Sequence, residues 1–169
     1  MPDLTPVIAA SARWLLNAYP PPEGALSRAL AHTQARQAST LAAGLRYPTA
    51  MDVQLLELLG PGGADRLDWL TGCEAHPDDA AWRTWVDETV VSWAACLLAD
   101  PALLAPARQA LAATEHHAET GALRRLTDPG AHDTEAAALL RHPDLLEPVA
   151  VLHRADLVER LNVAGAERA

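Results

Sequence analysis

The sequence predicts an all-α protein, built either as helical hairpin repeats stacked into a short solenoid or as a compact multi-helix bundle with one duplicated hairpin. Ala and Leu, which favour helices, are the commonest residues. The β-branched residues are sparse and lack the apolar–polar alternation that is typical of strands. Pro and Gly separate the apolar segments, as expected at helix boundaries. A length of 169 residues, half of them hydrophobic, suits one domain covering residues 1–169.

Four helices are expected in the first half of the chain. The apolar residues of the second recur every three or four positions, which indicates one buried face. Thr49 and Asp52 have the spacing of a capping box and predict the start of the third helix. Gly60 and Gly72 follow the third and fourth helices as stop signals. The expected ranges are 6–18, 24–45, 53–59 and 64–70.

The second half begins with the longest apolar segment. Pro77, Asp78 and Asp79 favour a helix start, because proline suits the first turn and acids complement the helix dipole. That helix is expected to run through residues 77–99 and to be central, since apolar residues lie on more than one side. Further helices are expected at residues 106–118, 122–126, 133–141 and 149–163.

One helical unit is written twice. Residues 93–106 read WAACLLADPALLAP, residues 135–148 read EAAALLRHPDLLEP, and eight of the fourteen positions are identical at an offset of 42 residues. The shared pattern is A-A-x-L-L-x-x-P-x-L-L-x-P. We expect the first proline to start a new turn after the helix and the second to begin the following helix.

Pairs of Leu recur along the whole chain. Four of these pairs start at residues 15, 58, 97 and 139, with spacings of 43, 39 and 42. A period near 40 resembles that of HEAT and armadillo proteins, in which helical hairpins stack on one another. The resemblance implies a binding scaffold. HEAT units usually also have an Asp and an Arg at set places. In this sequence Arg108 of one unit aligns with Ala150 of the other, so the Arg is not repeated.

The charge of the chain excludes some partners. The formal net charge is −9, and all thirteen basic residues other than His are Arg. Because nucleic-acid binders concentrate basic residues on one face, we expect no binding to DNA or RNA. Anionic lipid surfaces are excluded for the same reason. The absence of Lys and Phe resembles the codon bias of a GC-rich bacterial genome.

The location and the state of the two cysteines are also predicted. No apolar run approaches the ~20 residues needed to span a bilayer, and the N-terminus lacks the basic region of a signal peptide. We therefore expect a cytoplasmic protein. Cys73 and Cys96 do not form a C-x-x-C pair, and each has apolar or aromatic neighbours. They are interpreted as buried free thiols rather than as a disulfide or a redox site.

Three Trp residues form the first candidate site. On one continuous helix, Trp82, Trp85 and Trp93 would share a face. Packing in the core is one interpretation, because no Phe is present to fill it. The other is an anchor for a protein partner, since Trp dominates binding hot spots. In that case Arg83, with Asp79, Asp87 and Glu88, would surround the patch.

A second candidate lies at Glu115, His116, His117 and Glu119. On a helix, the two carboxylates would lie one turn apart with His116 nearby, a set that suits a metal ion only if a second helix supplies further ligands. A solvated polar helix end is the alternative. We find no motif for nucleophilic catalysis and no P-loop, because Gly60, Gly62 and Gly63 lack a following Lys. No metal or cofactor is predicted.

The segment WLLNAYP, from Trp14 to Pro20, followed by Leu26, resembles the opening of NarJ/TorD-type chaperones. These are all-helical proteins that escort molybdoenzyme subunits, so the resemblance implies an assembly chaperone for a redox enzyme. The sequence lacks the central motif of that family.

Three functions therefore remain open from the sequence. The first is a non-enzymatic protein–protein interaction module, a helical scaffold or adaptor. The second is an assembly chaperone, and the third is a metal-dependent enzyme of the helical-bundle type.

Overall fold

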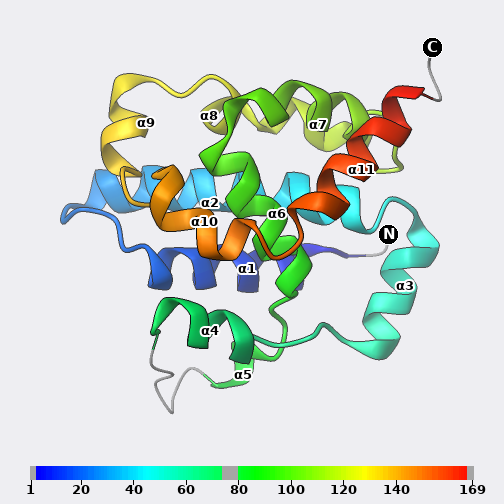
Figure 1. Cartoon of the computed structure of the whole chain (residues 1–169), viewed down its shortest axis with the longest axis horizontal. Coiled ribbons are helices and arrows are strands. Elements are labelled where there is room, and N and C mark those ends of the chain that lie inside the picture. Colours follow the sequence, from blue (N-terminus) through cyan, green and yellow to red (C-terminus); the bar gives the residue numbers. More distant parts are fainter. Residues whose placement is uncertain (1–2, 74–79, 167–169) are drawn as a thin grey trace.

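A computed structural model describes residues 3–73 and 80–166. All regular structure in this part of the chain is helical, with no strand, so the all-α prediction is confirmed. Figure 1 shows helix α6 crossing the middle of the molecule, with the pair α1–α2 on one side and α10–α11 on the other.

The first two helices form an antiparallel hairpin. Helices α1 (Thr5–Ala18) and α2 (Ala25–Arg46) pack along each other and are joined through Gly24, whose φ of 121° lies in a region that favours glycine. The predicted buried face of α2 is present, and Ala35, Ala38 and Leu41 have no exposed surface. This hairpin is the platform on which most of the other helices rest.

Helix α3 (Ala50–Leu59) begins with the predicted capping box. The Thr49 side chain accepts a hydrogen bond from the Asp52 N–H, and the Asp52 carboxylate accepts one from the Thr49 N–H. The helix ends at Gly60, which has a φ of 73°. Helix α4 (Asp65–Thr71) ends at Gly72 in the left-handed region. Both predicted glycine stops are therefore confirmed.

The predicted helix over residues 77–99 is wrong as one element. Its start at residues 77–79 lies outside the described residues. Helix α5 (Ala80–Arg83) ends before a break, and helix α6 (Glu88–Ala99) then starts anew. The break forms because the Asp87 carboxylate accepts a hydrogen bond from the Val90 N–H and so caps α6. Every residue from Val90 to Leu98 is buried, which confirms the central position predicted for this segment.

The remaining helices are shorter than the sequence predicts. The helix expected at residues 106–118 stops at Leu111, and the one expected at residues 133–141 stops at Ala136. In their place the chain forms turns and a 3-10 helix. The observed elements are η2 (Pro101–Leu103), α7 (Leu104–Leu111), η3 (His117–Ala122), α8 (Arg124–Thr127), α9 (Ala131–Ala136), α10 (Pro143–Ala150) and α11 (Arg154–Ala166).

The two copies of the duplicated unit differ in the secondary structure of their first halves, because α6 continues to Ala99 whereas α9 ends at Ala136. Leu104 and Leu146 are both buried at matching positions, and so are Leu98 and Leu140. Leu97, however, is buried in the central helix, whereas its counterpart Leu139 is 41% exposed beyond the end of α9. The expectation that the second proline begins a new helix is wrong for Pro148, which lies inside α10. Pro106 does lie in the first turn of α7.

Helices that are far apart in the sequence share one core. Helix α2 contacts α6, α7, α8 and α9 as well as α1, and buried side chains from α1 to α11 form one cluster. This arrangement corresponds to the compact-bundle alternative, because units of an open solenoid contact only their neighbours. Gly44 permits the close approach of α2 and α7, since a Cβ there would lie 2.5 Å from Leu111 Cδ1.

Candidate functional site

The three Trp residues of the predicted patch lie in three different environments. Trp93 is in α6 and only 4% exposed, and its Nε1 donates a hydrogen bond to the His153 carbonyl over 3.0 Å. The core interpretation is therefore confirmed for Trp93. Trp85 lies in the turn after α5 and is 38% exposed. The prediction that all three share one helix face is wrong because α5 and α6 are separate helices.

Trp82 and Arg83 make contacts within the protein. The Trp82 ring has the guanidinium of Arg13 at 5.4 Å and that of Arg83 at 5.3 Å from its centroid. Arg83 is buried and forms an ion pair with Asp68 of α4 through Nη2, although this nitrogen makes no regular hydrogen bond. Its charge is thus neutralised within the protein. Of the predicted patch, Trp85 is the residue that offers an exposed aromatic surface.

The acids predicted to surround the patch have structural partners. Asp87 caps α6 and accepts a hydrogen bond from the Tyr47 hydroxyl. Burial, and next the hydrogen bond and charge of Asp87, raise the pKa of Tyr47 above its ordinary value. Glu88 lies between Arg66 and the His153 ring. Asp79 lies outside the described residues.

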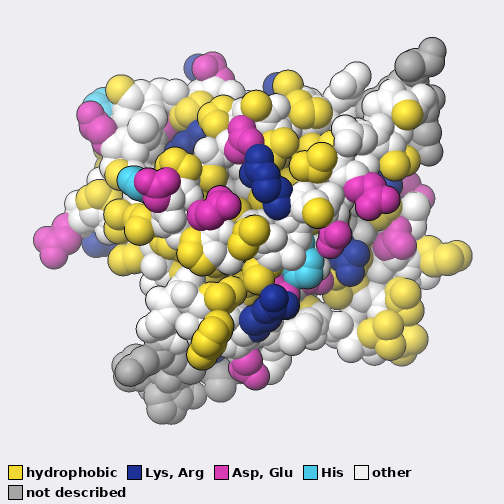
Figure 2. Space-filling view, viewed as in Figure 1, with side chains coloured by type: hydrophobic (Ala, Val, Ile, Leu, Met, Phe, Trp, Pro, Cys, Tyr) yellow, Lys and Arg dark blue, Asp and Glu magenta, His cyan; other side chains and the backbone are white. Residues whose placement is uncertain are grey.

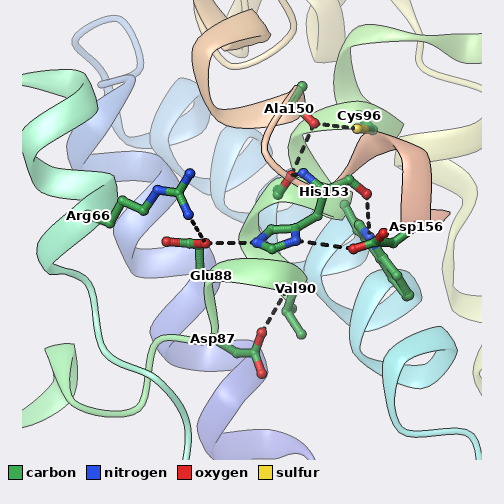
Figure 3. Close-up of polar contacts among 10 residues, drawn as sticks. Arg66, Asp87, Glu88, Val90, Cys96, Ala150, His153 and Asp156 are labelled. Atoms are coloured by element: carbon green, nitrogen blue, oxygen red, sulfur yellow. Dashed lines mark hydrogen bonds and ion pairs between the residues drawn. The ribbon is translucent and has the colours of Figure 1, made fainter.

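His153 joins the corner between α10 and α11 to the central helix (Figure 3). Its Nε2 is 2.8 Å from Glu88 Oε1, and its Nδ1 is 3.3 Å from Asp156 Oδ2. The Ser92 hydroxyl donates to the Ala150 carbonyl and accepts a hydrogen bond from the His153 N–H. Because the Ser92 hydroxyl bonds to backbone atoms and is fully buried, Ser92 and His153 connect the helices and do not form a nucleophile with its base.

The segment predicted as a metal-ligand candidate is not helical at its start. Glu115 precedes η3, and its Oε2 accepts a hydrogen bond from the Ala50 N–H at the start of α3. His116 Nε2 lies 2.8 Å from the Tyr47 carbonyl. These contacts fasten the loop to the α2–α3 junction. Within residues 3–73 and 80–166, no three His, Cys, Asp or Glu side chains come together as a metal site would require.

Beside this segment lies a groove of about 640 Å³. Its lining residues come mainly from α2, from the start of α1 and from the loop that contains η3. Leu4, Ile8 and Leu123 supply apolar walls. The remaining lining residues are Asp3, Thr5, His32, Thr33, Arg36, Gln37, Thr40, Gly44, Ala50, Glu115, His116, Glu119 and Ala122.

Helix α3 presents the most exposed apolar surface that belongs to a single helix. Val53 and Leu56 face the core, whereas Met51, Leu55, Leu58 and Leu59 on the other side are between 52% and 81% exposed. We call these four residues the α3 apolar face. Figure 2 shows hydrophobic side chains gathered over α3 at the right-hand edge of the molecule.

The sequence analysis did not single out the α3 apolar face. Met51, Leu55, Leu58 and Leu59 have the i, i+4, i+7, i+8 spacing of one helix face, while Val53 and Leu56 occupy the opposite side. The available signal was the presence of apolar residues on two sides of a ten-residue helix. Trp69 on α4, which is 82% exposed, is a further exposed aromatic residue.

Neither cysteine forms a disulfide. Cys96 is buried in α6, where its thiol donates to the Ala150 carbonyl at 3.3 Å, and burial raises its pKa to about 11. Cys73 follows α4 and is only partly buried, so the prediction of a buried free thiol is confirmed for Cys96 alone.

This difference predicts selective alkylation. At pH 8 a thiol with a pKa near 11 is a thiolate in roughly one molecule in a thousand, and the thiolate is the reactive form. Iodoacetamide should therefore label Cys73 in the native protein and label Cys96 only after unfolding in urea. Peptide mass spectrometry measures both sites, and equal native labelling rates would contradict the prediction.

The segment that resembles NarJ/TorD-type chaperones contributes its large side chains to the hydrophobic core. Trp14, Leu15 and Tyr19 are buried; the Trp14 Nε1 donates to Asp68 Oδ1 over 2.8 Å, and the Tyr19 hydroxyl donates to the Leu145 carbonyl. Burial, and next the nearby Cys73, raise the pKa of Tyr19 to about 12. These residues link α1 to α4 and α10 and leave little side-chain surface for a partner.

Comparisons with protein-family models, with curated proteins and with solved structures found no match. Among the described residues, no single helix is both long and apolar enough to cross a membrane. The segments Glu88–Ala99 and Pro101–Leu111 reach the required length and composition only together, and they meet at a bend of 108°.

Proposed function

We propose that this chain is a non-enzymatic protein–protein interaction module, a helical scaffold or adaptor, that binds its partner through the α3 apolar face. The single observation behind the proposal is the exposure of Met51, Leu55, Leu58 and Leu59 on one helix side. A contiguous exposed apolar patch commonly marks an interaction site.

The charges on α3 favour a particular kind of partner. Its charged residues are Asp52 and Glu57, and the helix has no basic residue. Two copies of the chain packed through α3 would bring acids close to acids, and each copy has a net charge of −9. A partner with an apolar surface flanked by basic residues would be electrostatically complementary.

A cytoplasmic location is part of the proposal. It is supported by the two free thiols, since cysteines of proteins in oxidising compartments are commonly paired in disulfides. The assembly-chaperone function is a special case in which the partner is a redox-enzyme subunit. It rests on the resemblance of residues 14–20 alone, and a genomic locus without any molybdoenzyme would contradict it.

The test compares Leu55→Glu/Leu58→Glu with the wild type. Both side chains are more than half exposed, so the variant should fold. Partners are identified by affinity purification from the source cells, and the Kd of each purified partner is then measured at two salt concentrations. The partner would bury both Leu side chains, so replacing them with Glu should weaken binding more than tenfold. Higher salt should weaken the wild-type complex.

Leu26→Glu is the matched control, because Leu26 is 67% exposed on α2 and does not belong to the α3 apolar face. Trp82→Ala/Trp85→Ala tests the surface predicted from the sequence in the same assay. The α3 proposal is wrong if partners bind Leu55→Glu/Leu58→Glu as tightly as the wild type. It is equally wrong if ultracentrifugation shows a dimer that this variant dissociates, because the face would then serve self-association.

A further inference from the structure

The groove along α2 contains two charged side chains of opposite sign without a partner. Arg36 of α2 and Glu119 of η3 both line it, and within the described residues neither side chain forms a hydrogen bond or an ion pair. By contrast, four other Arg residues, namely Arg66, Arg83, Arg125 and Arg154, each contact a carboxylate. The groove therefore presents one free positive and one free negative group.

The other acids of the groove are already used at helix starts. Asp3 Oδ1 accepts a hydrogen bond of 2.8 Å from the Thr5 N–H, which lowers the pKa of Asp3. Glu115 Oε2 accepts one of 3.0 Å from the Ala50 N–H. Both carboxylates are stabilised by the N-terminal dipoles of α1 and α3. Glu119 is consequently the carboxylate best placed to meet a ligand.

Neighbouring contacts bring together the two elements that carry the free charges. The Gln37 side chain, next to Arg36 in the sequence, donates a hydrogen bond to the Ala122 carbonyl and accepts one from the Leu126 N–H. These bonds hold the end of η3 against α2 beside Arg36. Arg36 and Glu119 therefore line the same groove without pairing with each other, and the Leu4 and Ile8 side chains supply part of its apolar lining.

We propose that this groove binds a small zwitterionic ligand, an amino acid or short peptide with apolar side chains. Its carboxylate would pair with Arg36, its ammonium group with Glu119, and its apolar side chains would contact Leu4 and Ile8. A simple anion would be repelled by the three carboxylates of the lining, and a simple cation would leave Arg36 without a partner. The groove volume of about 640 Å³ is within the range of about 300–1,000 Å³ of small-molecule sites.

The test titrates the protein with the dipeptide leucyl-leucine and follows backbone amide shifts by NMR. Saturable shifts are expected at residues around the groove. Acetylating the amino group or amidating the carboxyl group should each weaken binding about tenfold, since each removes one charge-assisted hydrogen bond. These two capped dipeptides distinguish zwitterion recognition from simple apolar binding.

Variants of the protein assign each ligand end to its residue. Arg36→Gln should weaken leucyl-leucine about tenfold and abolish the difference between it and the amidated dipeptide. Glu119→Gln should likewise weaken binding of leucyl-leucine about tenfold and abolish the difference in affinity between it and the acetylated dipeptide. Arg28→Gln and Glu23→Gln are the matched controls, because both residues are exposed and lie outside the groove. They should leave binding unchanged.

Three results would overturn this proposal: no saturable shift at the groove, equal binding of capped and free dipeptide, or equal effects of Arg28→Gln and Arg36→Gln. The proposal is independent of the α3 apolar face. Leu55→Glu/Leu58→Glu should bind leucyl-leucine normally, so failure of one proposal does not imply failure of the other.

Discussion

Trp14→Ala is expected to lower the free energy of unfolding by about 3–5 kcal/mol, because it leaves a cavity in the centre of α1's buried face. Trp14 is 1% exposed, and its indole N–H donates to Asp68 of α4. A domain of this kind is stabilised by only about 5–15 kcal/mol in total. The variant should therefore unfold at clearly lower urea concentration, as followed by circular dichroism at 222 nm.

Trp14→Phe separates packing from hydrogen bonding. It keeps most of the aromatic volume but leaves the Asp68 acceptor without the indole donor, so we expect a smaller loss of about 1.5–3 kcal/mol. Leu26→Ala, at an exposed position of α2, should change stability by less than about 0.5 kcal/mol. A loss from Trp14→Ala no larger than that of Leu26→Ala would contradict the central role of this residue.

The features of the fold that the sequence predicted depend on local interactions. The capping box of Thr49 and Asp52 and the glycines that end α3 and α4 act within three or four residues, so their chemistry is visible in the sequence. The buried face of α2 follows from its own periodicity. Such signals are sufficient to predict element type and several boundaries.

The break between α5 and α6 depends on contacts that sequence spacing does not reveal. Helix α5 ends at Arg83, Asp87 caps α6, and the Asp87 carboxylate accepts a hydrogen bond from the hydroxyl of Tyr47, forty residues away. With no knowledge of that contact, the acidic pair Asp87 and Glu88 resembled the exposed face of a continuous helix. An Asp directly before an apolar run was the available capping signal.

The candidate surfaces were missed for a related reason. Periodicity shows that α3 has apolar residues on two sides, but only packing decides which side is covered. The groove likewise requires α1, α2 and η3 to meet, and Arg36 and Glu119 are 83 residues apart in the sequence. Arg83 shows the converse case, since a residue predicted at a partner surface proved to be buried against Asp68.

Arg83→Ala is the second substitution with a large expected effect. Arg83 and Asp68 have side chains only 10% and 15% exposed, so removing the guanidinium leaves a largely buried carboxylate without its counter-ion. Loss of one member of a buried pair costs about 3–5 kcal/mol, and we expect the lower end because Asp68 keeps the Trp14 hydrogen bond. Urea unfolding monitored by circular dichroism measures this loss.

A matched comparison and a double-mutant cycle decide whether the effect comes from the pair. Arg66→Ala breaks the ion pair with Glu88, in which Arg66 is 62% exposed, and should cost no more than about 1 kcal/mol. Asp68→Ala/Arg83→Ala removes both buried charges, so its loss should be smaller than the sum of the two single losses. Strict additivity would show that Arg83 stabilises the fold through its contact with the Trp82 ring and not through Asp68. A stability change near zero for Arg83→Ala would instead mean that Arg83 is free for a partner, as the sequence alone suggested.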